Sequence, residues 1–462
     1  MSENQTNQKF TDLPLSKETL AFLNENGFDE MTEIQSKSIL PILSGVDVLA
    51  SAKTGSGKTL SFLIPIVEHL KMLDFKDKHG TGALIIAPTR ELAIQIFNVC
   101  SKLIKYHNLS VTIVIGGINK KIEDENLRKG CNIVIGTPGR LMDHLKNTAK
   151  FKISNLKILV LDETDRILDV GFEDELKNIL KLLPENRQTL MFSATQTSKL
   201  EDISRLSLKN KPLRISANPS NHDDLICDNL NQFYILATES KRLAVLYSIL
   251  KRFKNEKVMV FFSTCNSVNF HSQLFNFIGF KIISLHGKMN QIKRSNSFKN
   301  FEKEKTSILF CTDVAARGLD FSNVSTVIQY DVPVDVKEYI HRVGRTARAG
   351  KNGNAILFLI PTEEKYIKFL ETKNMILNEY CIERIKKITE KILKIVENNY
   401  FFKKNAILAF KSFLSSYSSL SLKEYFDVRK IDIEEFCKSF GLSSMPAIQF
   451  SANFNKKTQK RL

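Results

Sequence analysis

The chain has 462 residues, of which 43% are hydrophobic and 25% charged, and its formal net charge is +17. This composition is typical of globular protein and excludes a low-complexity or largely disordered chain. No stretch approaches the roughly 20 apolar residues that a membrane span requires, and the polar N-terminal segment lacks the apolar core of a secretory signal peptide. The basic charge favours a polyanionic partner, and nucleic acid is the first candidate.

The seven cysteines are scattered along the chain and form no CxxC pair. They therefore predict neither a disulfide framework nor a zinc site, and buried reduced thiols are the expected state. The eight histidines show no metal-ligand spacing either.

The first part of the chain alternates short apolar runs with longer stretches that are compatible with helices. Such alternation predicts a parallel sheet covered by helices on both faces, an α/β domain over residues 1–215. The segment 216–230 is rich in Asn, Ser and Asp, so we interpret it as a linker. The expected strands of this first domain are 47–52, 83–87, 111–116, 132–136, 158–162 and 189–193.

The same alternation resumes after the linker and predicts a second α/β domain over residues 231–365, with strands at 258–262, 281–285, 308–311, 326–330 and 355–360. Apolar residues then recur at spacings of three and four, which predicts amphipathic helices over 366–450 packed on the second domain. Residues 451–462 form a basic tail, for which an RNA contact and a nuclear import signal both stay open. The two apolar series are Ile382, Ile385, Ile388, Ile392 and Ile395, and then Ala406, Phe410, Phe413 and Tyr417.

The segment AKTGSGKT, residues 52–59, lies between an expected strand and an expected helix. Its glycines allow a tight loop whose backbone N–H groups can face a phosphate, and the helix N-terminus adds its positive dipole. Lys58 is expected to reach the β- and γ-phosphates, and the hydroxyl of Thr59 to bind Mg²⁺. The strict P-loop pattern has glycine where this chain has Ala52.

Two further segments carry charged side chains suited to phosphate chemistry. The segment DETD, 162–165, ends a strand, and acids in this position face the crevice where ligands bind. Asp162 suits Mg²⁺ and Glu163 suits the polarisation of an attacking water. In HRVGRTAR, 341–348, a helix would place His341, Arg345 and Arg348 on one face, where the arginines could act on a γ-phosphate. A solvated basic face is the alternative for such a pair.

The set of motifs resembles that of the DEAD-box RNA helicases over nearly the whole chain. Besides the segments above, it includes GFDEMTEIQ (27–35), PTREL (88–92), GG (116–117), TPGR (137–140), SAT (193–195), VFF (260–262), Gln291 with Arg294, and TDVAARGLD (312–320). The segments LDETDRILDVGFEDE and 409–442 are similar to the nucleolar, myc-regulated branch of that family. One departure is DETD in place of DEAD, with Thr164 where the family has alanine.

The resemblance implies two tandem RecA-like domains that close around ATP and single-stranded RNA, and it assigns a role to individual residues. Arg345 and Arg348 would act on the γ-phosphate, and Asp162 and Glu163 would be the Mg²⁺ ligand and the base. The nucleotide would be bound by Phe10, Gln35, Ala52, Thr54, Gly55, Ser56, Gly57, Lys58, Thr59 and Asp320. RNA would be held by Arg90, Gly117, Thr137, Arg140 and Thr312, and hydrolysis would be coupled to RNA binding by Asp165, Ser193, Thr195 and His341.

The implied activity is ATP hydrolysis with local unwinding of RNA, on pre-ribosomal RNA during large-subunit assembly. The implied setting is the nucleolus, with proteins of the pre-ribosomal particle as partners and a monomeric helicase. An ATP-dependent RNA clamp with little unwinding is the alternative, because the same motifs serve both, and the motifs disfavour a DNA helicase. The sequence leaves open the RNA site, the stimulating partners, the turnover rate, the effect of Thr164, and whether the C-terminal helices recruit or stabilise.

Overall fold

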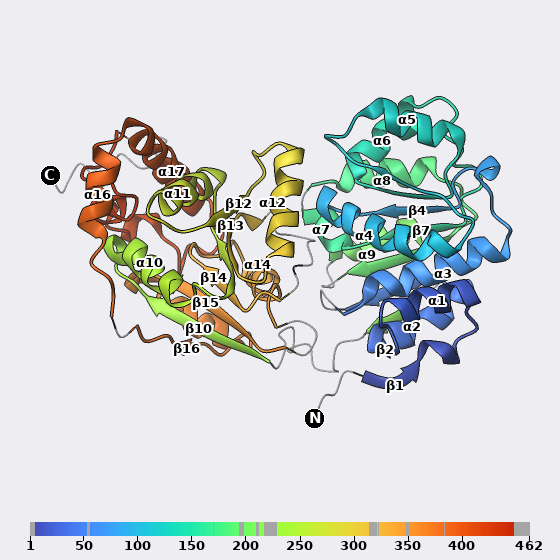
Figure 1. Cartoon of the computed structure of the whole chain (residues 1–462), viewed down its shortest axis with the longest axis horizontal. Coiled ribbons are helices and arrows are strands. Elements are labelled where there is room, and N and C mark those ends of the chain that lie inside the picture. The colour runs from blue at the N-terminus through green and yellow to red at the C-terminus, as the bar shows by residue number, and fades with distance from the viewer. Residues whose placement is uncertain are drawn as a thin grey trace. The chain divides into compact units, whose positions relative to one another are not determined.

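The structure, a computed structural model, describes residues 5–52, 56–169, 171–193, 198–208, 212–216, 229–313, 321, 323–347, 351–382 and 384–447. The described residues up to 216 form one compact α/β unit, and those from 229 onward form another (Figure 1). Most of the predicted linker, 217–228, lies outside the described residues. No helix in the described ranges is long and apolar enough to cross a membrane. The six described cysteines are free.

The first unit contains a parallel seven-stranded sheet in the order β5-β6-β4-β7-β8-β3-β9. All six predicted strands are present, each shifted by no more than two residues at either end. The seventh, β9 (Leu213–Ser216), was missed because only Ile215 of its four residues is buried, so it carries no apolar run. The predicted strands are β3 (Val48–Ser51), β4 (Ala83–Ile86), β5 (Val111–Val114), β6 (Ile133–Gly136), β7 (Ile158–Leu161) and β8 (Gln188–Ser193).

Helices cover both faces of this sheet, as the strand pattern predicts. Alternate residues of β4 enter different cores: Ala83 and Ile85 pack with α3, whereas Leu84 and Ile86 pack with α8. A separate antiparallel pair, β1 (Gln5–Lys9) with β2 (Glu30–Thr32), flanks α1 (Lys17–Glu25). The remaining helices are α2 (Glu33–Leu43), α3 (Lys58–Met72), α4 (Arg90–Leu103), α5 (Lys120–Lys129), α6 (Pro138–Asn147), α7 (Thr164–Asp169), α8 (Glu173–Leu182) and α9 (Ser198–Ser207).

The second unit repeats the design with the parallel order β12-β13-β11-β14-β15-β10-β16. The five predicted strands are present as β11 (Lys257–Phe261), β12 (Ile282–Leu285), β13 (Ser307–Cys311), β14 (Thr326–Gln329) and β15 (Gly353–Leu359). Two strands at one edge, β10 (Leu230–Leu236) and β16 (Asn378–Glu379), were not predicted. The helices between the strands are α10 (Arg242–Arg252), α11 (Cys265–Phe277), α12 (Gln291–Lys303), α14 (Val336–Val343) and α15 (Lys365–Glu371).

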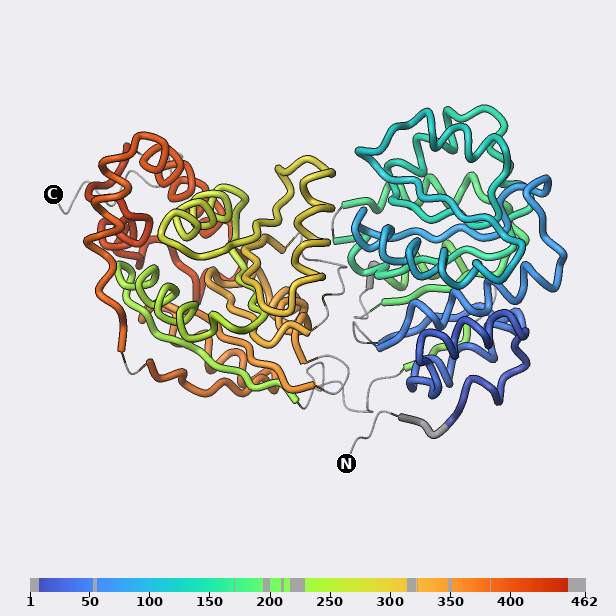
Figure 2. The backbone as a smooth tube through the Cα atoms, in the orientation of Figure 1, coloured from blue at the N-terminus to red at the C-terminus, as the bar shows by residue number. Residues whose placement is uncertain are grey.

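The C-terminal helices complete the core of this second unit. They are α16 (Thr389–Glu397), α17 (Tyr400–Ser418) and α18 (Ile433–Lys438). The predicted apolar series of α17 is confirmed, since Ala406, Phe410, Phe413 and Tyr417 are all buried. Helix α17 lies along α11, where the hydroxyls of Thr264 and Ser412 are 3.0 Å apart (Figures 1 and 2).

The other apolar series is helical only in its second half. Helix α16 begins at Thr389, so Ile382, Ile385 and Ile388 precede it, and the predicted helix over these positions is wrong. The backbone before and within this stretch is bonded to other elements of the unit: β16 pairs with β10, the Tyr380 N–H donates to Tyr234 O at 2.8 Å, and the Lys386 N–H donates to Ser248 Oγ at 2.9 Å. Such tertiary hydrogen bonds compete with the helix that the spacing alone favours.

Candidate active site and RNA interface

The predicted site residues of the first unit gather at one edge of its sheet. They follow strands that run parallel, so their carboxyl ends share one edge, where ligands bind in α/β proteins. The segments assigned to nucleotide follow β7 and β3, and the segment assigned to coupling follows β8, which lies between these two strands in the sheet. Those assigned to RNA follow β5, β6 and β4, also neighbours. The edge is thus divided into a nucleotide half and an RNA half.

The phosphate loop leads into α3 through Gly57. This glycine has φ +91°, and a Cβ on it would lie 2.6 Å from Gln35 Nε2, so no larger residue fits. Gln35 Nε2 donates to Gly57 O at 3.1 Å, while Gln35 Oε1 accepts from the Thr32 N–H at 2.8 Å. Gln35 therefore ties α2 to the loop, and its contact with adenine stays a prediction.

The side chains of this loop are prepared for an anion. Lys58 Nζ donates to Ala52 O at 2.9 Å, and the buried Ser56 Oγ has no hydrogen-bond partner within the described residues. Thr59 is half-buried in the first turn of α3. The Ala52 side chain is buried and its N–H donates to Ser193 O at 3.1 Å, so the alanine that departs from the P-loop pattern packs into the core.

The acids after β7 are buried together. Burial raises the pKa of Asp162 from 3.8 to about 7; Lys58 opposes this change, and the charges of Glu163 and Asp165 add to it. Glu163 has φ +46°, a left-handed conformation that costs a non-glycine residue energy and is found at functional sites. Its N–H donates to Asp162 Oδ1 at 3.0 Å. The site thus concentrates negative charge beside one lysine.

These residues fit a magnesium–nucleotide complex. Within the described residues, no group of three His, Cys, Asp or Glu side chains is arranged to hold a metal ion by itself. Mg²⁺ needs no such cage, because it binds through one or two protein oxygens, several waters and substrate phosphates. Thr59 and Asp162 would supply two such oxygens, and burial together with the charges of Glu163 and Asp165, which raise the pKa of Asp162, makes a further cation beside Lys58 favourable there.

Thr164, which replaces the family alanine, is fully buried. Its hydroxyl lies 3.1 Å from Leu161 O and 3.4 Å from Phe192 O, so it connects the ends of β7 and β8. The replacement of alanine by Thr164 therefore changes the contacts between the strand ends next to Asp162 and Glu163, whereas the acidic residues of the motif are the same as in the family.

The RNA half contains two helix N-termini and two arginines. Arg90 begins α4, and Thr137 is the N-cap of α6. Helix N-termini carry partial positive charge and bind phosphates. Gly117 has φ +89° after β5. Arg140 Nε donates to Glu123 Oε2 at 2.7 Å, and its Nη2 donates to Ile118 O at 3.0 Å. The structure thus brings the four predicted RNA residues of this unit to one edge.

In the second unit the predicted helix through residue 348 is wrong. Helix α14 ends at Val343, Gly344 is the C-cap, and Ala347 has φ +54°, which no helix allows. Arg345 nevertheless stays close to His341, because its Nε donates to His341 O at 3.0 Å. Thr312 follows β13, and its buried Oγ1 has no hydrogen-bond partner among the described residues.

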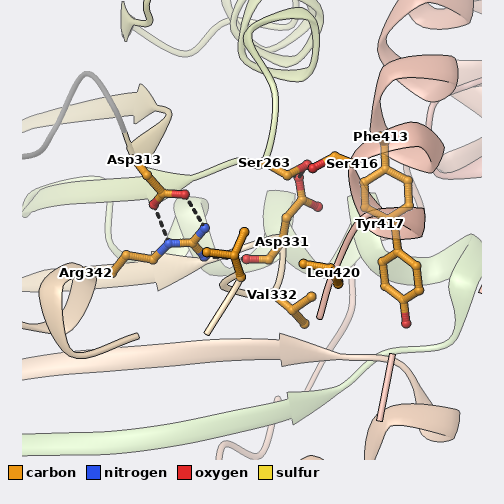
Figure 3. Close-up of a pocket in the computed structure, with 10 residues that line it drawn as sticks. Ser263, Asp313, Asp331, Val332, Arg342, Phe413, Ser416, Tyr417 and Leu420 are labelled. Carbon is orange, nitrogen blue, oxygen red and sulfur yellow. Dashed lines mark hydrogen bonds and ion pairs between the residues drawn. The ribbon is translucent and has the colours of Figure 1, made fainter. Parts of the chain in front are cut away.

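Sequence reasoning gave no role to Arg342, although it lies inside a recognised motif. Its side chain is 1% exposed, and its Nε and Nη2 donate to the two carboxylate oxygens of Asp313 at 2.6 and 2.8 Å (Figure 3). Nη1 donates to Asp331 O at 2.6 Å. Arg342 therefore joins the motif after β13 to α14. Both motifs were visible in the sequence, but their pairing is a tertiary contact.

Phe10 is 2% exposed and belongs to the apolar core of the first unit, so its stacking on adenine stays a prediction. Five predicted site residues lie outside the described ranges: Thr54, Gly55, Thr195, Asp320 and Arg348. Asp165 and Ser193 are buried at the carboxyl edge of the first sheet, after β7 and at the end of β8.

Comparison with known proteins places this geometry in a family. The DEAD/DEAH box helicase family matches residues 32–203, and the helicase conserved C-terminal domain matches 241–350. The protein named ATP-dependent RNA helicase has1 of Schizosaccharomyces pombe is 46% identical over 458 residues, which cover 98% of this chain and 79% of the relative. The chain belongs to the DEAD-box family of RNA helicases. It is an RNA-binding enzyme that uses ATP, as its motifs predict.

Two further likenesses refine the placement. The protein named probable ATP-dependent RNA helicase ddx18 of Dictyostelium discoideum is 46% identical over 452 residues, covering 97% of this helicase and 75% of that protein. The has1 and ddx18 relatives confirm the predicted branch. A solved structure of Mss116p bound to single-stranded RNA and AMP-PNP superposes with a TM-score of 0.84 at 31% identity, covering 96% of this chain and 92% of that one. Residues 399–448 match the C-terminal extension of ATP-dependent rRNA helicases similar to SPB4.

Proposed function

We propose that this helicase acts as a monomer in the nucleolus, where it uses ATP with Mg²⁺ to remodel pre-ribosomal RNA during large-subunit assembly. The C-terminal extension carries the proposal, because residues 399–448 match the extension of an rRNA helicase family. Its central helix is part of the core of the second unit. Proteins of the pre-ribosomal particle are the expected partners.

The nucleotide half of the first unit performs the hydrolysis in this proposal. Lys58 Nζ has three N–H donors and gives one to Ala52 O, so within the described residues two are available to phosphate oxygens. Glu163 accepts a proton from the attacking water, and its strained backbone fixes the carboxylate beside Asp162. Mg²⁺ bound at Thr59 and Asp162 would offset phosphate charge.

The RNA half holds the ribose–phosphate backbone. Helix N-termini, backbone N–H groups and arginines recognise phosphates without reading bases, which gives affinity for many sequences. ATP binding and hydrolysis then favour an RNA-bound and an RNA-released state in turn, and RNA is remodelled by the difference in affinity.

The experiment is ATP hydrolysis with and without single-stranded RNA, for the wild-type protein and for Glu163→Gln. We expect RNA to raise the wild-type rate, and Glu163→Gln to abolish hydrolysis while still retaining RNA in the presence of ATP. Glu185→Gln, which changes an exposed carboxylate of the same unit, is the matched control and should behave as wild type. Equal rates for wild type and Glu163→Gln would exclude the proposed base.

A strand-displacement assay then separates the helicase from the clamp. Release of a short duplex strand that requires hydrolysis supports remodelling, whereas a long-lived RNA complex without displacement supports the clamp. Cross-linking of the protein to RNA in cells tests the substrate class, and recovery of mainly messenger RNA would contradict the ribosomal assignment.

A further inference from the structure

The segment between β5 and α5 contains Gly117, one of the predicted RNA contacts, and it is held at both sides by buried polar side chains. A carboxylate that the motifs do not include, Glu123 on α5, is 2% exposed. Its Oε1 accepts from the Ile115 N–H at 2.9 Å, directly before the two glycines. On the other side of Gly117, Ile118 O accepts from Arg140 Nη2.

The same carboxylate orients the arginine. Glu123 Oε2 accepts from Arg140 Nε at 2.7 Å and from His144 Nε2 at 2.9 Å. Both partners belong to α6, which lies next to α5 at one side of the sheet (Figure 1). One carboxylate with three donors therefore joins the loop after β5 to the arginine in the first turn of α6.

The ring of His144 is itself fixed. It is fully buried, and its Nδ1 lies 2.8 Å from the hydroxyl of Thr148 and 3.1 Å from Asp124 Oδ1. A second ion pair joins the same two helices at the surface, where Lys120 Nζ lies 2.7 Å from each carboxylate oxygen of Asp143. The relative position of α5 and α6 is thus set by polar contacts as well as by packing.

This arrangement leaves the arginine both rigid and available. Its two hydrogen bonds use two of five guanidinium N–H donors, and its Nη1 forms a longer ion pair with Asp143 Oδ2 at 3.7 Å. Within the described residues three donors therefore make no hydrogen bond and can turn to a phosphate. A guanidinium whose orientation is already fixed loses less conformational entropy when it binds an anion. A buried carboxylate also gives the guanidinium a charge-assisted bond that an amide cannot replace.

We infer that Glu123 is a positioning residue for RNA binding: it holds Arg140 and the loop of Gly117 in the geometry that grips the RNA backbone. The inference rests on the proposed RNA role of Arg140. Glu123 acts through other residues and takes no part in ATP hydrolysis. Its loss should therefore weaken RNA binding and leave the catalytic step intact.

The test is Glu123→Gln in the full chain. The amide has one acceptor oxygen, so its NH₂ group must face either the Ile115 N–H or the donors of Arg140 and His144. We expect the Kd for a fluorescent single-stranded oligouridine, measured with a non-hydrolysable ATP analogue, to rise about tenfold, the effect of losing one charge-assisted hydrogen bond. The KM for RNA in the ATPase assay should rise by the same factor, with kcat at saturating RNA and the KM for ATP unchanged.

Asp47→Asn is the matched control. Asp47 is also a largely buried carboxylate that accepts a backbone N–H, from Thr189 at 2.7 Å, but it precedes β3 and so lies at the opposite edge of the same sheet. The Asp47→Asn variant should lose about as much thermal stability as Glu123→Gln and should keep the RNA affinity of wild type. An equal loss of RNA affinity in Asp47→Asn would mean that general destabilisation explains the effect, which overturns the inference.

Arg140→Ala distinguishes this inference from the proposed function. If Arg140→Ala weakens RNA binding and Glu123→Gln does not, the positioning role is refuted while the RNA site stands. If Arg140→Ala leaves RNA affinity unchanged, the RNA role of Arg140 is refuted and the positioning role with it. When Arg140→Ala is already present, Glu123→Gln should raise the Kd for RNA by a smaller factor than it does in the wild-type protein, because the two residues act as a unit.

Discussion

Glu363 gives a direct measure of how the C-terminal extension is built into the second unit. This buried carboxylate lies in the turn Pro361–Glu363 after β15. Its Oε1 accepts from the hydroxyl of Tyr417 on α17 at 2.6 Å, and its Oε2 accepts from the Ile360 N–H at 2.9 Å. Burial raises the pKa of Glu363 from 4.5 to about 7, against the opposing effects of the Tyr417 bond and the charge of Arg242.

The sign of the pH dependence follows from this raised pKa. Between about pH 4.5 and pH 7 the folded protein keeps a proton on Glu363 that the unfolded chain has released. The contribution of Glu363 to stability is therefore complete below pH 4.5 and is lost as pH rises to about 7. With about 1.4 kcal/mol for each pKa unit, the loss amounts to about 3 kcal/mol.

Glu363→Gln removes the titration and keeps the shape of the protonated carboxyl group. Its amide oxygen can accept from the Ile360 N–H, and its NH₂ group can donate to the Tyr417 oxygen. We expect the free energy of unfolding of the variant to exceed that of wild type by about 1 kcal/mol at about pH 5 and by up to about 3 kcal/mol at about pH 8. The assay is chemical denaturation across this range, followed on the transition of the second unit.

Glu364→Gln, which changes the exposed carboxylate next to it, is the control and should show the pH profile of wild type. A difference between wild type and Glu363→Gln that stays constant from about pH 5 to pH 8 would refute the reasoning, since it would mean that Glu363 does not titrate in this window.

Two further changes test the core of the extension and the departure in the DETD motif. Phe410→Ala removes a fully buried ring of α17 and should lower the free energy of unfolding of the second unit by about 3–5 kcal/mol in denaturant titrations. The control Phe401→Ala, at a 55% exposed position, should change this free energy by less than about 1 kcal/mol. Similar losses in both variants would contradict the packing of α17. Thr164→Ala removes the hydroxyl near Leu161 O and Phe192 O, so it should lower the free energy of unfolding, measured by thermal unfolding, by about 1 kcal/mol. The rate of RNA-stimulated ATP hydrolysis should stay within about threefold of wild type. A larger change in rate would show that this hydroxyl takes part in coupling.

The buried strands and the loops that follow them could be predicted because their signals are local. A strand such as β7, Ile158–Leu161, is apolar at every position, since a central parallel strand is covered on both faces. The residues after it must lie at the carboxyl edge. The assignment of Lys58, Asp162 and Glu163 to one site therefore needed only the order of strands and loops, and the structure places them at that edge.

Edge strands and helix ends could not be predicted in this way. Strand β16 consists of two residues, and both are exposed. It is a strand because its backbone pairs with that of β10 beside it. The helix expected through HRVGRTAR stops at Val343. The backbone then continues in tight turns, in which the N–H groups of Arg345 and Thr346 donate to Arg342 O and Val343 O, and Ala347 has φ +54°.

The sequence by itself determined the family, the two α/β domains and the chemistry of the nucleotide site, because glycine-rich loops and strand-end acids are recognisable by residue type and spacing. Only the tertiary structure decided how charges far apart in the chain are paired. Glu123 meets Arg140 and His144 across two helices, and Arg342 meets Asp313 across twenty-nine positions. Such pairs leave no periodic signal, since each depends on which loops the sheet order brings together.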